Sequence, residues 1–143
     1  MAAHRIFIVE DEMMIAMMVE DFLADLGWDV VGVAGTLDQA FAMARDTVVD
    51  AALLDVNLNG RNTFAVAEIL AARDIPFVFA TGYGAQGIAD RFRGAPTLTK
   101  PYQLNELDGA LQQALGVGRG VAEGRFSDPG SVVLPGPKNS SGC

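Results

Sequence analysis

The chain is poor in cysteine and histidine, the residues that cross-link small proteins through disulfides or bind zinc in them. Among its 143 residues it has one cysteine, Cys143, and one histidine, His4. A single cysteine forms no internal disulfide, and one histidine with one cysteine does not make a zinc site. We therefore expect a fold held together by its core alone, in a reducing compartment, with the cytoplasm as the expected location.

Positive charge and long apolar runs are also scarce. Eighteen Asp and Glu residues stand against ten Lys and Arg residues, which gives a formal net charge of −8. This excess argues against nucleic acid or an anionic membrane surface as a partner. No apolar run reaches the roughly 18 residues that a membrane-spanning helix needs, so no membrane partner is expected. Hydrophobic residues make up 50% of the chain, enough for one domain with a full core.

Short apolar runs alternate with amphipathic stretches along the chain. The runs predict five strands, at 5–9, 28–34, 51–55, 76–80 and 96–99. The other stretches predict five helices, at 12–26, 37–46, 63–73, 84–93 and 103–115. The helix at 84–93 should be short or weak, because Gly84, Gly87 and Gly94 lie in or beside it. This alternation predicts an α/β fold whose parallel sheet has helices on both faces.

Three local patterns refine this outline. In 12–26, the apolar residues Met14, Met18, Phe22 and Leu26 fall on one helical face. Thr36, with Gln39 three residues later, forms a capping-box pattern that opens the helix at 37–46. Residues 117–143 are rich in glycine and proline, so we predict a domain over 1–116 and a flexible tail over 117–143.

Charged residues fall where the predicted strands end. Glu10 and Asp11 follow the strand at 5–9, Asp55 ends its strand, and Lys100 follows the strand at 96–99. Because the carboxyl ends of parallel strands meet at one edge of a sheet, these side chains should lie together. Three carboxylates there repel one another and one lysine does not balance them, so we expect a divalent cation, Mg²⁺. Glu10 and Asp11 also suit the start of the next helix, and both roles can hold at once.

Asp55 is the candidate reactive group. It ends the most apolar strand and precedes the turn-rich run VNLNG, and a carboxylate there can attack phosphorus as a nucleophile. Taken alone, such an aspartate more often forms a turn or a helix cap. Lys100 would keep Asp55 ionised and then pair with a phosphoryl oxygen, to which the hydroxyl of Thr81 could donate. The backbone carbonyl of Asn57 is a further candidate metal ligand.

The order and spacing of Glu10-Asp11, Asp55, Thr81 and Lys100-Pro101 resemble the receiver domain of two-component response regulators. The resemblance covers about residues 4–116 and implies a flavodoxin-like, doubly wound fold with strand order 2-1-3-4-5. It implies that Asp55 accepts a phosphoryl group from the phosphohistidine of a sensor histidine kinase or phosphotransfer protein. It also implies that Asp11, Asp55 and the Asn57 carbonyl bind Mg²⁺, with Glu10 acting largely through water, and that Thr81 and Lys100 contact the phosphoryl group.

A narrower resemblance concerns residues 76–83, PFVFATGY, which look like the PFxFATGY signature of the FATGUY group of single-domain regulators. That group is associated with alphaproteobacterial signalling, often the general stress response. Thr97 stands where most receivers have a switch tyrosine or phenylalanine; Tyr83 is either its replacement or an exposed loop residue. Asn59 stands where a proline is common, and should loosen that loop. Pro101 should fix the loop after Lys100, with its peptide isomer left open.

The expected function is that of a single-domain response regulator, not an enzyme, with slow autodephosphorylation as its only turnover. Phosphorylation would draw Thr81 inward and change the face formed by residues 84–93, 96–99 and 103–115, where a downstream protein would bind. Two alternatives remain. An aspartyl-phosphate hydrolase typically has a second aspartate where this chain has Asn57. A phosphorylation-independent interaction module is disfavoured by the intact set of acids.

Overall fold

The protein was analysed as a computed structural model that describes residues 4–82 and 87–123. One sheet contains five strands, β1 (Arg5–Val9), β2 (Asp29–Ala34), β3 (Ala51–Asp55), β6 (Phe77–Thr81) and β7 (Thr97–Thr99). Every neighbouring pair in it is parallel, and the spatial order is β2-β1-β3-β6-β7. The predicted order 2-1-3-4-5 is confirmed. Among the described residues, no helix has both the length and the apolar character that crossing a membrane requires.

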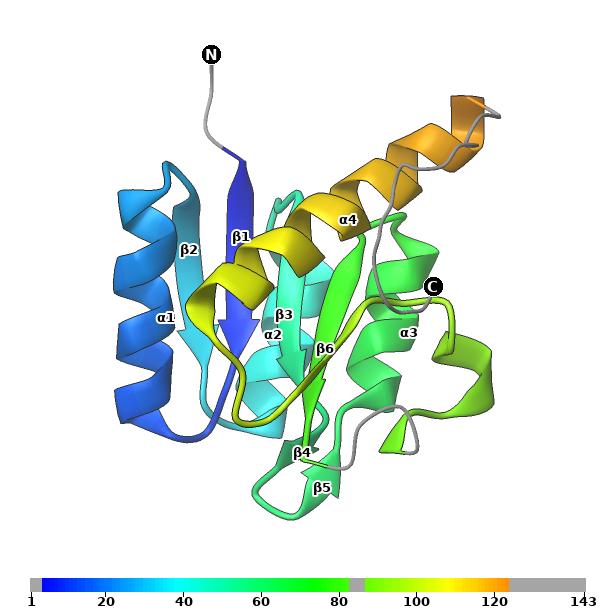
Figure 1. Cartoon of the computed structure of the whole chain (residues 1–143). Coiled ribbons are helices and arrows are strands. Elements are labelled where there is room, and N and C mark those ends of the chain that lie inside the picture. Colours follow the sequence, from blue (N-terminus) through cyan, green and yellow to red (C-terminus); the bar gives the residue numbers. More distant parts are fainter. Residues whose placement is uncertain (1–3, 83–86, 124–143) are drawn as a thin grey trace.

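Helices cover both faces of this sheet (Figure 1). The α-helices in the described ranges are α1 (Met13–Asp25), α2 (Leu37–Asp46), α3 (Phe64–Ala72) and α4 (Leu104–Glu123). Helices α1 and α4 bury one core, and α2 and α3 bury the other. Successive residues of β1 alternate between them, with Ile6 and Ile8 in the first core and Phe7 and Val9 in the second. Burial on both faces explains why the central strands are continuous apolar runs.

The buried face of α1 differs from the predicted apolar face. Its buried residues are Ala16, Val19 and Leu23, whereas Met14 is 81% exposed and Met18 is 57% exposed. Leu26, also on the predicted face, is exposed, and only Phe22 of that set packs against the core. A constant spacing of four residues drifts around a helix of 3.6 residues per turn. The mixed spacing of three and four in 16, 19 and 23 keeps one side toward the sheet.

Two other helices differ in length from the prediction. The described part of the segment predicted as helix 84–93 forms no α-helix; it contains the short 3-10 helix η2 (Asp90–Phe92), and residues 83–86 lie outside the description. The last helix, predicted to end at 115, continues to Glu123 through the glycines at 116, 118 and 120. An isolated glycine costs a helix only about 1 kcal/mol, so it need not end one. The predicted tail therefore begins as helix, and its residues 124–143 lie outside the description.

A small antiparallel hairpin, β4 (Asn57–Leu58) and β5 (Arg61–Asn62), directly follows β3 and was not predicted. Its two turn residues, Asn59 (φ +54°) and Gly60 (φ +83°), both have positive φ. Two such residues in a two-residue hairpin loop make a type I′ turn, for which Asn-Gly is the preferred sequence. The prediction that Asn59 loosens this loop is therefore wrong: Asn59 supplies the turn geometry that closes the hairpin.

The predicted capping box of α2 is confirmed, and it yields a stability prediction. Thr36 Oγ1 accepts a hydrogen bond from the Gln39 backbone at 3.2 Å, and Gln39 Oε1 accepts from the Thr36 backbone at 3.2 Å. Thr36→Ala removes the cap and should lower the free energy of unfolding by about 1 kcal/mol. Urea unfolding measures this change, and Thr36→Ser, which keeps the hydroxyl, should stay close to the wild type. Equal losses in the two variants would contradict the assignment.

Candidate functional site

The charged residues predicted to meet lie at the carboxyl edge of the sheet. Asp55, the last residue of β3, pairs with Ala80 of β6, and Thr81 pairs with Thr99 of β7. The Lys100 backbone N–H donates to the Thr81 carbonyl at 2.8 Å, which places the lysine beside the other two residues. The sheet register therefore brings residues from three strands to one place.

Three carboxylates form a cluster at this edge. Glu10, Asp11 and Asp55 each offer an oxygen, and these oxygens lie within 4.8 Å of one another. Glu10 and Asp55 are each only 4% exposed, and Asp11 is half-buried. Surface acids often gather without a ligand, but two buried carboxylates at this separation are costly to ionise together. A hard divalent cation such as Mg²⁺ prefers oxygen ligands, so these three carboxylates are suitable ligands for it.

Lys100 forms ion pairs with two acids of this cluster. Its Nζ lies 3.0 Å from Asp55 Oδ2 and 3.4 Å from Glu10 Oε1. The side chain is 26% exposed, so it reaches the acids from the protein surface. The Lys100–Pro101 peptide bond is cis, which answers the question that the sequence left open. One ammonium group offsets at most one of the three negative charges.

Burial shifts the pKa values of the cluster. The pKa of Glu10 is raised to about 7: burial is the largest cause and the Asp55 charge adds to it, against a hydrogen bond from the Glu12 backbone and the Lys100 charge. Burial also raises the pKa of Asp55, although its hydrogen bond and ion pair with Lys100 oppose the shift. For Lys100, burial alone would lower the pKa, but Asp55 and Glu10 together raise it. A second source of positive charge would allow all three acids to ionise.

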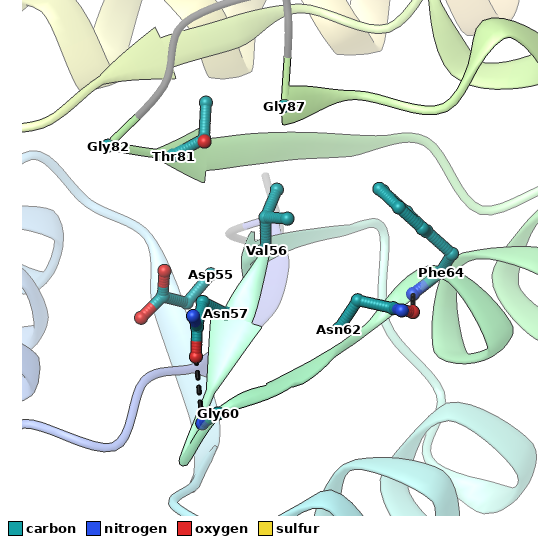
Figure 2. A pocket seen from close by; sticks show the side chains of 9 residues that line it. All are labelled: Asp55, Val56, Asn57, Gly60, Asn62, Phe64, Thr81, Gly82 and Gly87. Carbon is teal, nitrogen blue, oxygen red and sulfur yellow. Dashed lines mark hydrogen bonds between the residues drawn. The ribbon is translucent and has the colours of Figure 1, made fainter.

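A pocket of about 300 Å³ opens beside Asp55. Figure 2 shows it between the end of β3, the β4–β5 hairpin and the end of β6, with Thr81 above Asp55. Asn57, Phe64 and Gly82 also line it. Thr81 is 2% exposed. The pocket thus joins a buried carboxylate to a strand-end hydroxyl in a space larger than a phosphoryl group needs.

The predicted site residues fall into three groups. Glu10, Asp11, Asp55 and Lys100 lie together, as the contacts above describe. Thr81 and Asn57 line the same pocket as Asp55, and the Asn57 side chain accepts a hydrogen bond from the Gly60 backbone at 2.8 Å. Tyr83, predicted as a replacement switch residue, lies outside the described residues.

Sequence reasoning missed two residues that lie beside this site. Thr63 is fully buried, and its hydroxyl donates to the Asp55 carbonyl at 2.8 Å, which fixes the backbone at Asp55. A threonine just before a helix looks like an ordinary cap, so no local signal singled it out. Tyr102 is half-buried two residues after Lys100, and burial, followed by the Glu10 charge, raises its pKa to about 12. Tyr102 is close to an acid far away in the sequence, which is a tertiary feature that local patterns do not show.

Comparison with known proteins identifies the class. Residues 6–112 match the family model described as the response regulator receiver domain. The match spans more than half of the chain, which therefore belongs to the response regulator receiver family. Together with the observed strand order, this confirms the predicted flavodoxin-like α/β fold.

Particular relatives are similar over most of the described chain. The solution structure of SdrG from Sphingomonas melonis Fr1 is 49% identical with a TM-score of 0.71, covering 80% of this chain and 98% of that one. PhyR of Methylorubrum extorquens is 32% identical over 117 residues, 79% of this chain and 44% of PhyR. PdtaR of Mycobacterium tuberculosis is 30% identical over 115 residues, 78% of this chain and 56% of PdtaR. The chain thus spans about half the length of the curated relatives it matches.

Proposed function

We propose that this receiver domain accepts a phosphoryl group on the Asp55 carboxylate from the phosphohistidine of a sensor histidine kinase or phosphotransfer protein. One observation carries the proposal: a buried aspartate beside a pocket, 3.0 Å from a lysine ammonium and within a cluster of three carboxylates. Membership of the receiver family supports it. The chain would act as a signalling domain, with slow autodephosphorylation as its only turnover.

The chemistry follows from the placement of the groups. An Asp55 oxygen attacks phosphorus in line, the new P–O bond forms as the P–N bond to imidazole breaks, and the imidazole leaves with its electron pair. The transition state of phosphoryl transfer is stabilised mainly by positioned charges, and the protein contributes little covalent chemistry. Lys100 Nζ, already within 3.0 Å of Asp55, pairs with a phosphoryl oxygen as charge passes to that group. Glu10, Asp11, Asp55 and the Asn57 carbonyl would hold Mg²⁺, which supplies two further positive charges.

The same transfer would switch an interaction surface. The phosphoryl group adds negative charge and acceptor oxygens next to Thr81 and Lys100, at the ends of β6 and β7. Thr81 would bond one of these oxygens and draw its loop inward, with Tyr83 and Pro101 taking part in the change. The surface formed by residues 87–94, β7 and α4 would then bind a downstream protein.

The signalling context is also a proposal. The run PFVFATGY at residues 76–83 supports placing the chain in the FATGUY group of single-domain regulators. The likeness to PhyR, one solved structure of which is described as a stress response regulator, supports a role in the general stress response. The cytoplasm, where a phosphohistidine donor is made from ATP, is the proposed compartment.

The hydrolase alternative has less support. Asn57 stands where such an enzyme typically has its acid, and an amide has no carboxylic proton to give. Its side-chain oxygen is also held by the Gly60 backbone N–H. No observation therefore favours hydrolysis of a substrate over acceptance of a phosphoryl group.

An amide NMR experiment with a phosphoryl analogue tests the proposal. Beryllofluoride with Mg²⁺ should shift the amide signals of residues 55–63, 81–82 and 97–104 in the wild type. A solved structure of SdrG is of a BeF3-activated conformation, so a relative responds to this reagent. Asp55→Asn is the control and should show no such shifts. Shifts that also occur in the control, or none in the wild type with Mg²⁺, would contradict the proposal.

A further inference from the structure

The turn residue Asn59 contacts two other loops at the carboxyl edge of the sheet. Its backbone N–H donates to Asp11 Oδ2 at 2.9 Å, in the loop after β1. Its side-chain Nδ2 donates to the Gly35 carbonyl at 3.2 Å, in the loop after β2. One exposed residue thus connects three loops, and one of its contacts is to a member of the carboxylate cluster.

The hairpin itself does not require the contact between Asn59 and Asp11. Its strands pair Asn57 with Asn62 and Leu58 with Arg61, and the Gly60 N–H donates to the Asn57 side chain. The left-handed conformation of Asn59 is what the turn requires. The N–H of this residue is therefore free of hairpin bonding and points to a carboxylate from another loop.

We infer that Asn59 is a positioning residue for Asp11, whose backbone N–H holds one carboxylate oxygen so that the Glu10–Asp11–Asp55 cluster is preformed for a divalent cation. Groups that orient metal ligands without touching the metal typically change affinity 10–100-fold. Asp11 is only half-buried, so without this bond its side chain would rotate into solvent. The inference rests on the proposed function, in which this cluster binds Mg²⁺.

Three substitutions change the N–H and the turn geometry of this residue in different combinations. Asn59→Pro removes the N–H and cannot reach φ +54°, since proline is fixed near about −65°. Asn59→Gly keeps the N–H and tolerates the left-handed conformation, and loses only the bond to Gly35. Asn59→Ala also keeps the N–H, but its β-carbon makes the positive φ of this turn position unfavourable.

The experiment measures two quantities on the full chain: Mg²⁺ affinity by calorimetric titration, and stability by urea unfolding without metal. Asn59→Pro should bind Mg²⁺ about 10-fold or more weakly than the wild type. Asn59→Gly and Asn59→Ala should keep affinity within about 3-fold, although the alanine variant unfolds more easily. Affinity would then depend on the N–H and not on stability.

The outcomes are distinct. If affinity falls in step with stability across the series, with alanine between glycine and proline, the role of Asn59 is structural and the inference is overturned. If Asn59→Pro binds Mg²⁺ as tightly as the wild type, the inference is overturned while the metal site of the proposed function stands. If the wild type itself does not bind Mg²⁺, both fall.

Discussion

Asp55→Asn should abolish phosphorylation of this chain by any phosphohistidine donor. The amide has nearly the shape of the carboxylate but lacks the anionic oxygen that attacks phosphorus. It also removes one of the three charges that would hold Mg²⁺. Incubation with a radiolabelled phosphodonor and Mg²⁺, followed by electrophoresis, measures the label on the protein. We expect stoichiometric labelling of the wild type and none of the variant.

A matched control and a stability measurement make this result specific. Asp46→Asn changes an exposed aspartate at the end of α2 and should leave labelling intact. Burial raises the pKa of Asp55, so the folded state disfavours its ionised form, and the neutral amide should not destabilise the metal-free protein at pH 8. Loss of label in a stably folded variant would then identify the acceptor. Labelling of Asp55→Asn at wild-type stoichiometry would place the acceptor elsewhere.

The metal-free protein should lose stability as the pH rises from about 4.5 to about 7. Burial, aided by the Asp55 charge, raises the pKa of Glu10 from 4.5 to about 7. The folded state therefore binds this proton more tightly than the unfolded state does. The stability that this bound proton contributes is complete below the unfolded-state pKa of 4.5 and is lost as the pH rises through the folded-state pKa of about 7. It amounts to at most about 3 kcal/mol.

Comparison with Glu10→Gln isolates this effect. Glutamine keeps an oxygen that can accept from the Glu12 backbone, as Glu10 Oε2 does at 3.1 Å, but has no proton to lose. Urea unfolding in the presence of a chelator, at steps between pH 4.5 and 8, gives the free energy of unfolding of both proteins. The wild type should become progressively less stable than the variant over this interval, and Mg²⁺ at pH 8 should reverse the loss. A difference that does not change with pH would contradict the burial of an ionisable Glu10.

The fold and the centre of the site were predictable because they follow from strong, local patterns. Strands buried on both faces must be continuous apolar runs, so their ends were visible in the sequence. Parallel strands end at one edge, so Glu10, Asp55 and Lys100 had to meet there. The roles of these residues in phosphoryl transfer remain predictions, but their meeting place did not depend on any long-range information.

The parts that were not predicted depend on tertiary contacts or on competing local preferences. Helix α1 faces the sheet with Ala16, Val19 and Leu23. The prediction chose the wrong face because Met14 and Met18 are apolar but exposed. Thr63 acts through a hydrogen bond to the carbonyl of Asp55, which sequence spacing does not show. At Asn59 the prediction considered only the absence of proline, although Asn-Gly is the preferred sequence of a type I′ turn.

The exposed methionines of α1 also provide a natural set of spectroscopic probes. Met13, Met14, Met17 and Met18 are 51%, 81%, 62% and 57% exposed, on a helix that starts just after the acidic loop. Methyl groups of mobile side chains rotate rapidly and give sharp signals even in large assemblies. Met43 lies on α2, across the sheet, with its methyl against Gly32, and serves as an internal reference. Carbon-13 labelling of methionine methyls would therefore follow events beside the site in the unmodified protein, without an attached dye.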